Sequence, residues 1–273
     1  MFRASRLFLL LCLVLSSAAL SAQSAEEFHR KTEDLIDSLT TLDSRTVGID
    51  SFGMYSSFMA DDTPAEFEGG LLGPPPPSTP PMMRELVRRG PAVLPELMAH
   101  LSDQHPTKLQ VGNPPTTTPS NSFSFMWMVY GDEYDRRDRS KPRVRRSDSF
   151  LERPFKGGYT VKVGDVCFAL IGQIVNRSLT PVRYQPTAGL IVNSPIETPK
   201  LIDEVKKDWG AATSADLQAS LLADLRSSTV AAFDAGALAR LRFYYPDVYT
   251  GLQGSDLKKK TLFERKLSRA GRK

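Results

Sequence analysis

The chain has too few cysteines for a fold that depends on disulfide bonds. Only two cysteines occur among its 273 residues, and Cys12 lies in an N-terminal segment that we expect to be removed. Cys167 is then left without an internal disulfide partner, so stability must come from packing. Because Cys167 lies in an apolar stretch, we interpret it as a buried thiol and not as a nucleophile.

Motifs for catalysis and for metal binding are absent from the sequence. It contains no HExxH, no GxSxG, no CxxC and no glycine-rich phosphate loop. Three histidines occur, His29, His100 and His105, and the last two are five residues apart. That separation misses the three- or four-residue spacing that aligns ligands on one helix face. We therefore predict no catalytic residue, no metal site and no cofactor.

Long hydrophobic runs are also missing, except at the N-terminus. Arg3 and Arg6 precede the apolar residues 7–15 (LFLLLCLVL), and small residues dominate residues 16–25 (SSAALSAQSA). This order is typical of a cleavable signal peptide. The apolar run is too short for a membrane span, which needs about 20 residues. We predict that residues 1–24 are removed and that the mature protein is periplasmic or extracellular.

Positive charge is concentrated at the two ends of the chain. Residues 256–273 contain eight basic and two acidic residues, and two arginines lie in the predicted signal peptide. The formal charge of the whole chain is +4, so the part between these ends is net acidic. A basic surface on the folded body is therefore not expected, and we predict no nucleic-acid partner.

The spacing of apolar residues predicts a mainly α fold packed as one domain. An amphipathic helix is expected at 25–42, in an N-terminal region that extends to residue 72, before a proline-rich linker at 73–81. A helical domain at 82–254 follows, with a long irregular insertion at 104–158, and 255–273 form a basic tail. Within the insertion, residues 123–130 are aromatic and are expected as a short strand or a docked loop. The expected helices in the domain cover residues 82–89, 94–102, 165–177, 194–209, 214–226 and 234–244.

The segment 165–177 is apolar on nearly all sides, which favours a buried central helix. A buried strand at 166–171 is the alternative. Residues 178–193 are ambiguous. Ser194 and Glu197 form a capping-box pattern at the start of the next helix, although Pro199 leaves open a regular start one turn later.

Residues 90–103 (GPAVLPELMAHLSD) resemble the first helix of a HEAT repeat. Ala169, Leu170 and Ile174 are similar to the second HEAT helix, but they occur about sixty residues later, which implies one repeat split by the insertion. More broadly, residues 85–107 and 163–210 resemble a family of exported bacterial proteins with similar GDVC, GQIVNR, VRYQPT and NSP…ETP stretches. That family has no assigned activity, so the resemblance implies helical hairpins and no specific chemistry.

A polar cluster at the end of the most apolar helix is the predicted ligand-binding site. Arg177 and Arg183 are candidates to form a fork for a carboxylate or phosphate group. The competing interpretation is structural, in which these side chains satisfy carbonyl groups at the helix end. The candidate ligand-binding residues are Asp165, Gln173, Asn176, Arg177, Arg183, Tyr184 and Gln185.

The tail is the second candidate surface. Its basic side chains alternate with leucine and phenylalanine, as in segments that contact anionic lipid or other polyanions. A frayed, solvated tail is the alternative. The candidate contact residues are Lys258, Lys259, Lys260, Arg265, Lys266 and Arg269.

Three functional hypotheses follow from these features. The first is an exported helical binding or scaffold protein with a protein partner outside the cytoplasm. The second is an enzyme of unrecognised type that uses residues 165–185, in which Arg177, Arg183 and a carboxylate such as Asp165 converge in a cleft. The third is a peripheral envelope protein attached weakly to the membrane surface through its tail. The lack of catalytic motifs favours the first.

Overall fold

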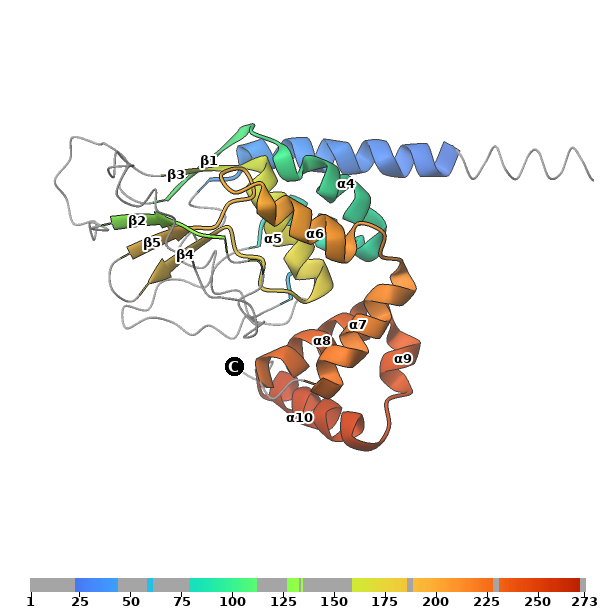
Figure 1. Cartoon of the computed structure of the whole chain (residues 1–273). Helices are drawn as coiled ribbons and strands as arrows, with labels where there is room; N and C mark the ends of the chain where they lie inside the picture. The colour runs from blue at the N-terminus through green and yellow to red at the C-terminus, as the bar shows by residue number, and fades with distance from the viewer. Residues whose placement is uncertain are drawn as a thin grey trace, which may run out of the picture.

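The computed structural model of the chain describes residues 23–43, 58–60, 79–111, 127–132, 134, 159–185, 189–227 and 231–270 (Figure 1). Within these residues the protein is mainly helical, and the predicted fold class is confirmed. The apolar run of the predicted signal peptide and residues 73–78 of the predicted linker lie outside the described residues.

An amphipathic helix begins the described part of the chain. It covers residues 23–38 and ends in a 3₁₀ turn at Leu39–Thr41, close to the predicted range of 25–42. Ile36, Leu39 and Leu42 are fully buried, whereas residues 23–27 are exposed. In Figure 1 this helix, drawn in blue, runs beside α4. Its C-terminal half is therefore part of the core, and its N-terminal half lies at the surface.

Two short helices form the predicted hairpin. Helix α3 (Pro81–Arg88) and helix α4 (Leu94–Ala99) are joined by a 3₁₀ turn at Gly90–Val93, and a second 3₁₀ turn (His100–Ser102) extends α4. Gly90 forms the corner with a φ of 63°, and a Cβ there would lie 2.7 Å from Cε1 of Tyr244. Both the left-handed backbone and the close ring require glycine at this position.

Helix α5 (Val163–Val175) is the central element of the fold. All but two of its residues are buried, and the helix contacts α3, α4 and β3. This settles the alternative between helix and strand at 166–171 in favour of the helix. A helix that is apolar on all sides needs neighbours around it, and α5 has them.

The strands are the main departure from the prediction. Strand β1 (Pro106–Val111) pairs antiparallel with β3 (Tyr159–Lys162). Strands β2 (Trp127–Tyr130), β5 (Gly189–Val192) and β4 (Val182–Gln185) form a second sheet in that order, with β2 parallel and β4 antiparallel to β5.

The prediction that 104–158 is irregular was therefore wrong for the segment that forms β1. The expected short strand at 123–130 is present in its second half as β2, and β1 was not expected at all. In β1, buried Thr107, Leu109 and Val111 alternate with exposed residues, which is the pattern of a half-buried strand. The initial Pro106 and the short length concealed this pattern.

Contacts between α4 and α5 are consistent with the two helices that resemble a HEAT repeat. The chain between them includes the β1–β3 ribbon, so α4 and α5 do not form a simple helical hairpin. The mainly helical fold is confirmed, but the assignment to HEAT repeats stays a prediction.

Helix α6 (Lys200–Trp209) leads into a group of helices that we call the C-terminal lobe. The lobe consists of α7 (Ser214–Ser227), α8 (Ala231–Tyr244), α9 (Pro246–Thr250) and α10 (Gly254–Ala270), and it lies below α5 and α6 in Figure 1. The regular part of α6 starts after Pro199, and Pro246 begins α9 directly after α8. No helix of the described part of the chain is both long and apolar enough to cross a membrane.

Candidate functional site

Asp165, the first of the predicted ligand-binding residues, lies at the N-terminal end of α5 and is fully buried. Its carboxylate accepts hydrogen bonds from the Tyr159 hydroxyl (2.8 Å), from the Lys162 backbone N–H (2.9 Å) and from the Ser194 hydroxyl. Ser194 in turn accepts the backbone N–H of Ile196 at 3.0 Å. Burial raises the pKa of Asp165 and that of Tyr159 above their ordinary values. This sealed cluster joins β3, α5 and the segment before α6, and its role is structural.

The other end of α5 carries a second polar cluster. Asn176 ends the helix in the left-handed conformation, with a φ of 57°, and its amide donates to Asp224 of α7 at 2.8 Å. Arg177 donates to the same carboxylate at 2.6 Å and to the Ser220 hydroxyl at 2.9 Å. Its guanidinium also lies over the ring of Trp209, 5.4 Å from the centroid. These contacts attach the end of α5 to α7.

Arg240 of α8 completes this cluster and was not predicted. Its side chain is buried and donates to the carbonyl of Gln173 (2.6 Å), to Oδ1 of Asn176 (3.1 Å) and to the carbonyl of Gly236 (2.8 Å). The side-chain oxygen of Gln173 accepts the backbone N–H of Met59 at 3.2 Å. We call Gln173, Asn176, Arg177, Asp224 and Arg240 the α5–lobe junction.

The predicted ligand-binding cluster is therefore divided among separate places. Asp165 and Arg177 are twelve residues apart at opposite ends of α5, about 18 Å along the helix axis. Their predicted convergence in one cleft was wrong. Arg183, Tyr184 and Gln185 lie on β4, and their side chains are outside the described residues. For Gln173, Asn176 and Arg177, the geometry favours the structural interpretation that the sequence left open.

The basic tail divides between an inward and an outward side. The Lys259 ammonium donates to the carbonyl of Leu225 (2.6 Å) and contacts Asp234, while Lys260 donates to the carbonyl of Tyr249 (3.0 Å). Phe263 is buried among the helices of the lobe. Helix α10 is thus packed through at least Phe263, and the alternative of a frayed tail is wrong for this part. Lys266 and Arg269 belong to α10, but their side chains are not described.

Four exposed side chains define what we call the outward face of α10. Leu257 and Leu262 keep 46% and 60% of their surface exposed, which is unusual for large apolar residues of this protein. Lys258 and Arg265 are also exposed. At 3.6 residues per turn, Lys258, Leu262 and Arg265 lie within about 60° of one another around the helix, and Leu257 lies at one edge of the face, about 140° from Leu262. The result is a mixed apolar and basic surface opposite the packed side.

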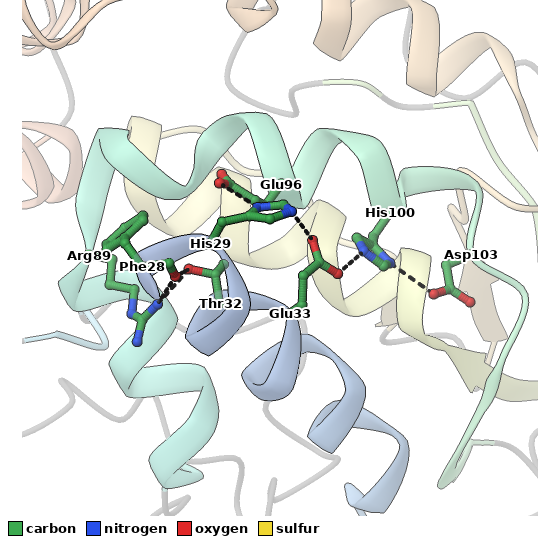
Figure 2. A network of polar contacts seen from close by, with 8 residues as sticks. All are labelled: Phe28, His29, Thr32, Glu33, Arg89, Glu96, His100 and Asp103. Atoms are coloured by element: carbon green, nitrogen blue, oxygen red, sulfur yellow. Dashed lines mark hydrogen bonds and ion pairs between the residues drawn. The ribbon is translucent and has the colours of Figure 1, made fainter. Parts of the chain in front are cut away.

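The three histidines of the chain belong to a third polar cluster, which was also not predicted, and Figure 2 shows the part of it that contains His29 and His100. His100 uses both ring nitrogens, with Nε2 2.9 Å from Glu33 and Nδ1 3.0 Å from Asp103. The ring of His29 contacts Glu96 at 3.3 Å and Glu33 at 4.0 Å, and His105 contacts Asp103 at 2.7 Å. We call this alternating chain the histidine network; along its length it contains Glu96, His29, Glu33, His100, Asp103 and His105.

The histidine network connects the N-terminal helix to α4 and to the segment that follows α4. Beside it, Arg89 donates to the Thr32 hydroxyl and to the Phe28 carbonyl and lies over the Phe28 ring, 5.0 Å from the centroid (Figure 2). The sequence did contain a local sign of this network: His29 precedes Glu33 by four residues, and His100 follows Glu96 by four. Such pairs share a helix face. Which two faces would meet was not visible in the sequence.

Electrostatics at the centre of the histidine network favour the charged forms of His100 and Asp103. Burial alone would lower the pKa of His100, but its hydrogen bonds to Asp103 and Glu33 outweigh burial and raise that pKa above the ordinary value. The pKa of Asp103 is lowered, because hydrogen bonds from His105 and His100 outweigh the effect of burial. Among the described residues, no group of three His, Cys, Asp or Glu side chains is arranged to hold a metal ion.

Cys167 lies in the middle of α5 and is completely buried. Burial, reinforced by the charges of Asp103 and Asp165, raises the pKa of its thiol. The thiol is therefore protonated and inaccessible, as expected for a packing residue.

Comparisons with known proteins add no family assignment. No protein-family model, no curated protein and no solved structure matches this chain.

Proposed function

We propose that the chain is an exported binding protein and that the outward face of α10 contacts a protein partner outside the cytoplasm. The observation that carries the proposal is the exposed Leu262 with Lys258 and Arg265 beside it, together with a second exposed leucine, Leu257, at the edge of the same face. The predicted signal peptide supplies the compartment. Three exposed large apolar side chains are known among the described residues, and all three, including Phe243, belong to the C-terminal lobe.

The physical argument concerns what these side chains gain on binding. Fully burying a leucine is worth roughly 2 kcal/mol, and only about half of each of these side chains is still exposed, so Leu262 with the two basic side chains beside it supplies a small anchor to which Leu257 adds at the edge. Lys258 and Arg265 favour a partner with acidic groups around an apolar centre, because complementary charge speeds encounter and selects the partner. The packed side of α10 holds this surface rigidly, which lowers the entropic cost of binding.

Attachment to an anionic membrane surface is the second candidate, favoured by the same basic side chains. An interfacial helix normally buries a whole apolar face in the lipid. In α10, Phe263 is buried and Leu267 is partly buried against the core. Among the described side chains of α10, only Leu257 and Leu262 are then left to insert into lipid, which is less than a whole apolar face. We therefore prefer a protein partner to a membrane surface.

A photo-crosslinking residue at position 262 tests the proposal in the exported fraction. We expect a discrete crosslinked species with a protein, which is lost when Lys258→Glu and Arg265→Glu are combined. The matched control combines Lys108→Glu and Lys207→Glu, two exposed lysines on β1 and α6 that produce the same change in net charge. Crosslinking that is equal in the two double variants, or absent in the parent, would contradict the proposal.

Vesicle flotation separates the two candidates. If the chain floats with vesicles that contain about 30% anionic lipid at low salt, and the Lys258→Glu/Arg265→Glu variant does not, the membrane candidate replaces the protein partner. N-terminal sequencing of the exported protein tests the compartment separately, with a mature end expected after residue 24.

A further inference from the structure

His100 is held between two carboxylates that belong to different elements. Its Nε2 lies 2.9 Å from Glu33 on the N-terminal helix, and its Nδ1 lies 3.0 Å from Asp103 after α4. A neutral imidazole has one N–H and one lone pair, so it can donate to only one of these oxygens. Only the imidazolium form satisfies both contacts. In the neutral form, one ring nitrogen would direct its lone pair at a carboxylate oxygen.

Charged side chains from the N-terminal helix and from α4 with its extension surround the His100 ring. On the N-terminal helix, Glu33 faces it directly, and His29 contacts that same carboxylate from one turn away. On α4 and its extension, Glu96 contacts His29, and Asp103 is shared with His105. The charged groups that face the ring are therefore the carboxylates of Glu33 and Asp103, with two more histidines at their far sides.

Apolar burial does not hold this part of the N-terminal helix by itself. The fully buried apolar residues of the helix begin at Ile36, whereas Phe28 is half-buried and residues 23–27 are exposed. Before Ile36, Leu35 is only partly buried against the core, and polar contacts cross to α3 and α4, from Arg89 to Thr32 and through the histidine network. Protonation can therefore alter the first turns while the last turn stays in the core.

We propose that the histidine network is a pH-sensitive latch, in which protonated His100 docks the first turns of the N-terminal helix onto α4 and loss of that proton loosens them. The inference is independent of the proposed function, because it concerns a contact within the chain on a different face of the molecule from α10. For an exported protein, the pH that matters would be that of the surroundings.

The direction of the effect follows from the two pKa shifts. Because the pKa of His100 is raised, its contribution is complete below the ordinary histidine value and is lost as the pH rises through the raised value. Because the pKa of Asp103 is lowered, its contribution is lost only as the pH falls through that lowered value. The latch is therefore closed in mild acid and opens toward alkaline pH.

Amide hydrogen exchange of the purified chain at pH 5.5 and pH 8.5, corrected for intrinsic rates, tests the latch. We expect protection of the amides at 27–34 to fall about threefold to tenfold at the higher pH, since one pKa unit corresponds to a factor of ten. The amides of α7 should change much less and serve as the internal reference. In His100→Gln the same amides should be weakly protected at both pH values.

The control variant is His105→Gln, which removes a histidine from the exposed end of the network and should leave the pH response intact. The protonation of the His100 ring is followed directly by its ¹⁵N imidazole signals, which should show two N–H groups at pH 5.5. Equal protection at both pH values would overturn the latch, as would a pH response that survives in His100→Gln. A neutral His100 ring at pH 5.5 would overturn it as well.

Discussion

The N-terminal helix and the C-terminal lobe are both attached to the region of α3–α5 by polar contacts, but different groups make these contacts. At the α5–lobe junction, buried Arg240 and half-buried Arg177 contact Asn176, Asp224 and backbone carbonyls. At the N-terminal helix, partly exposed histidines contact glutamate and aspartate. A guanidinium stays charged at every pH that the fold tolerates, whereas an imidazole titrates near neutrality.

The two attachments therefore contribute to stability in different ways. The junction is centred on buried Arg240 and Asn176, and the charge of its arginines is permanent, so it contributes a constant part of the stability. The histidine network is closer to solvent and its charge is conditional, so it makes a small, pH-dependent contribution. Substitutions at the junction should therefore cost more stability than substitutions in the network, because the cost of removing a polar group increases with its burial.

Breaking the junction should have the largest effect. Arg240→Ala removes three hydrogen bonds and leaves the Asn176 amide oxygen and two carbonyls buried without this donor. We expect the free energy of unfolding to fall by about 3 kcal/mol. Urea unfolding at pH 5.5 and pH 8.5 should give the same loss, because no titrating group is removed. Arg240→Lys is the control and should recover part of the loss; a loss that changes strongly between these pH values would contradict the prediction.

Crowding the junction should have the next largest effect. A Cβ added at Gly236 would lie 2.4 Å from Oδ1 of Asn176, which Arg240 holds in place. Gly236→Ala should therefore cost about 1–3 kcal/mol, despite the higher helix propensity of alanine. Gly251→Ala is the matched control in the same lobe, because its nearest neighbour would be at 3.4 Å. If thermal melting shows Gly236→Ala to be no less stable than Gly251→Ala, the junction is looser than described.

Coupling between Glu33 and His100 should be smaller and should depend on pH. A double-mutant cycle with Glu33→Gln and His100→Gln isolates this pair from the rest of the network. We expect a coupling energy of about 1 kcal/mol at pH 5.5 and less than about half of that at pH 8.5, because neutral His100 satisfies only one carboxylate. Urea titrations at the two pH values give both numbers. Coupling that grows with pH would show that the sign of the latch is wrong.

The outer end of the network should have the smallest effect. The side chain of His105 is 78% exposed, so its ion pair with Asp103 is screened by solvent. His105→Gln should change the free energy of unfolding by less than about 0.5 kcal/mol at either pH. Asp103→Asn at the shared position should cost more, since it also weakens the contact with His100. If the two variants lose equal stability in urea, the exposed contact matters more than its exposure implies.

Much of the helical structure was predictable because the signal is local. Apolar residues at spacings of three and four lie on one face of their own helix whatever the rest of the chain does. This is why 82–89, 94–102, 214–226 and 234–244 agree with the observed helices to within a few residues. At 165–177 the composition indicated burial, and length indicated a helix, since strands seldom reach thirteen residues.

The strands and the polar clusters were less predictable because their partners lie far away in the sequence. Strand β2 pairs with β5 about sixty residues later, and four residues alone carry almost no periodic pattern. The predicted cluster of polar residues between 165 and 185 treated nearness in sequence as nearness in space. The two ends of a thirteen-residue helix are far apart in space, so Asp165 near the start of α5 does not meet Arg177 just after its end.

The sequence by itself determined which segments are helical, which faces they bury, and that Cys167 is a packing residue, since each of these depends on composition and spacing within one segment. Only the tertiary structure decided that Glu33 meets His100 across 67 residues and that Arg240 reaches Asn176 across 64. Each histidine on its own is an ordinary surface residue with no special chemistry. Its proton acquires a role when folding places a second carboxylate against the other side of the ring, and no local pattern encodes that contact.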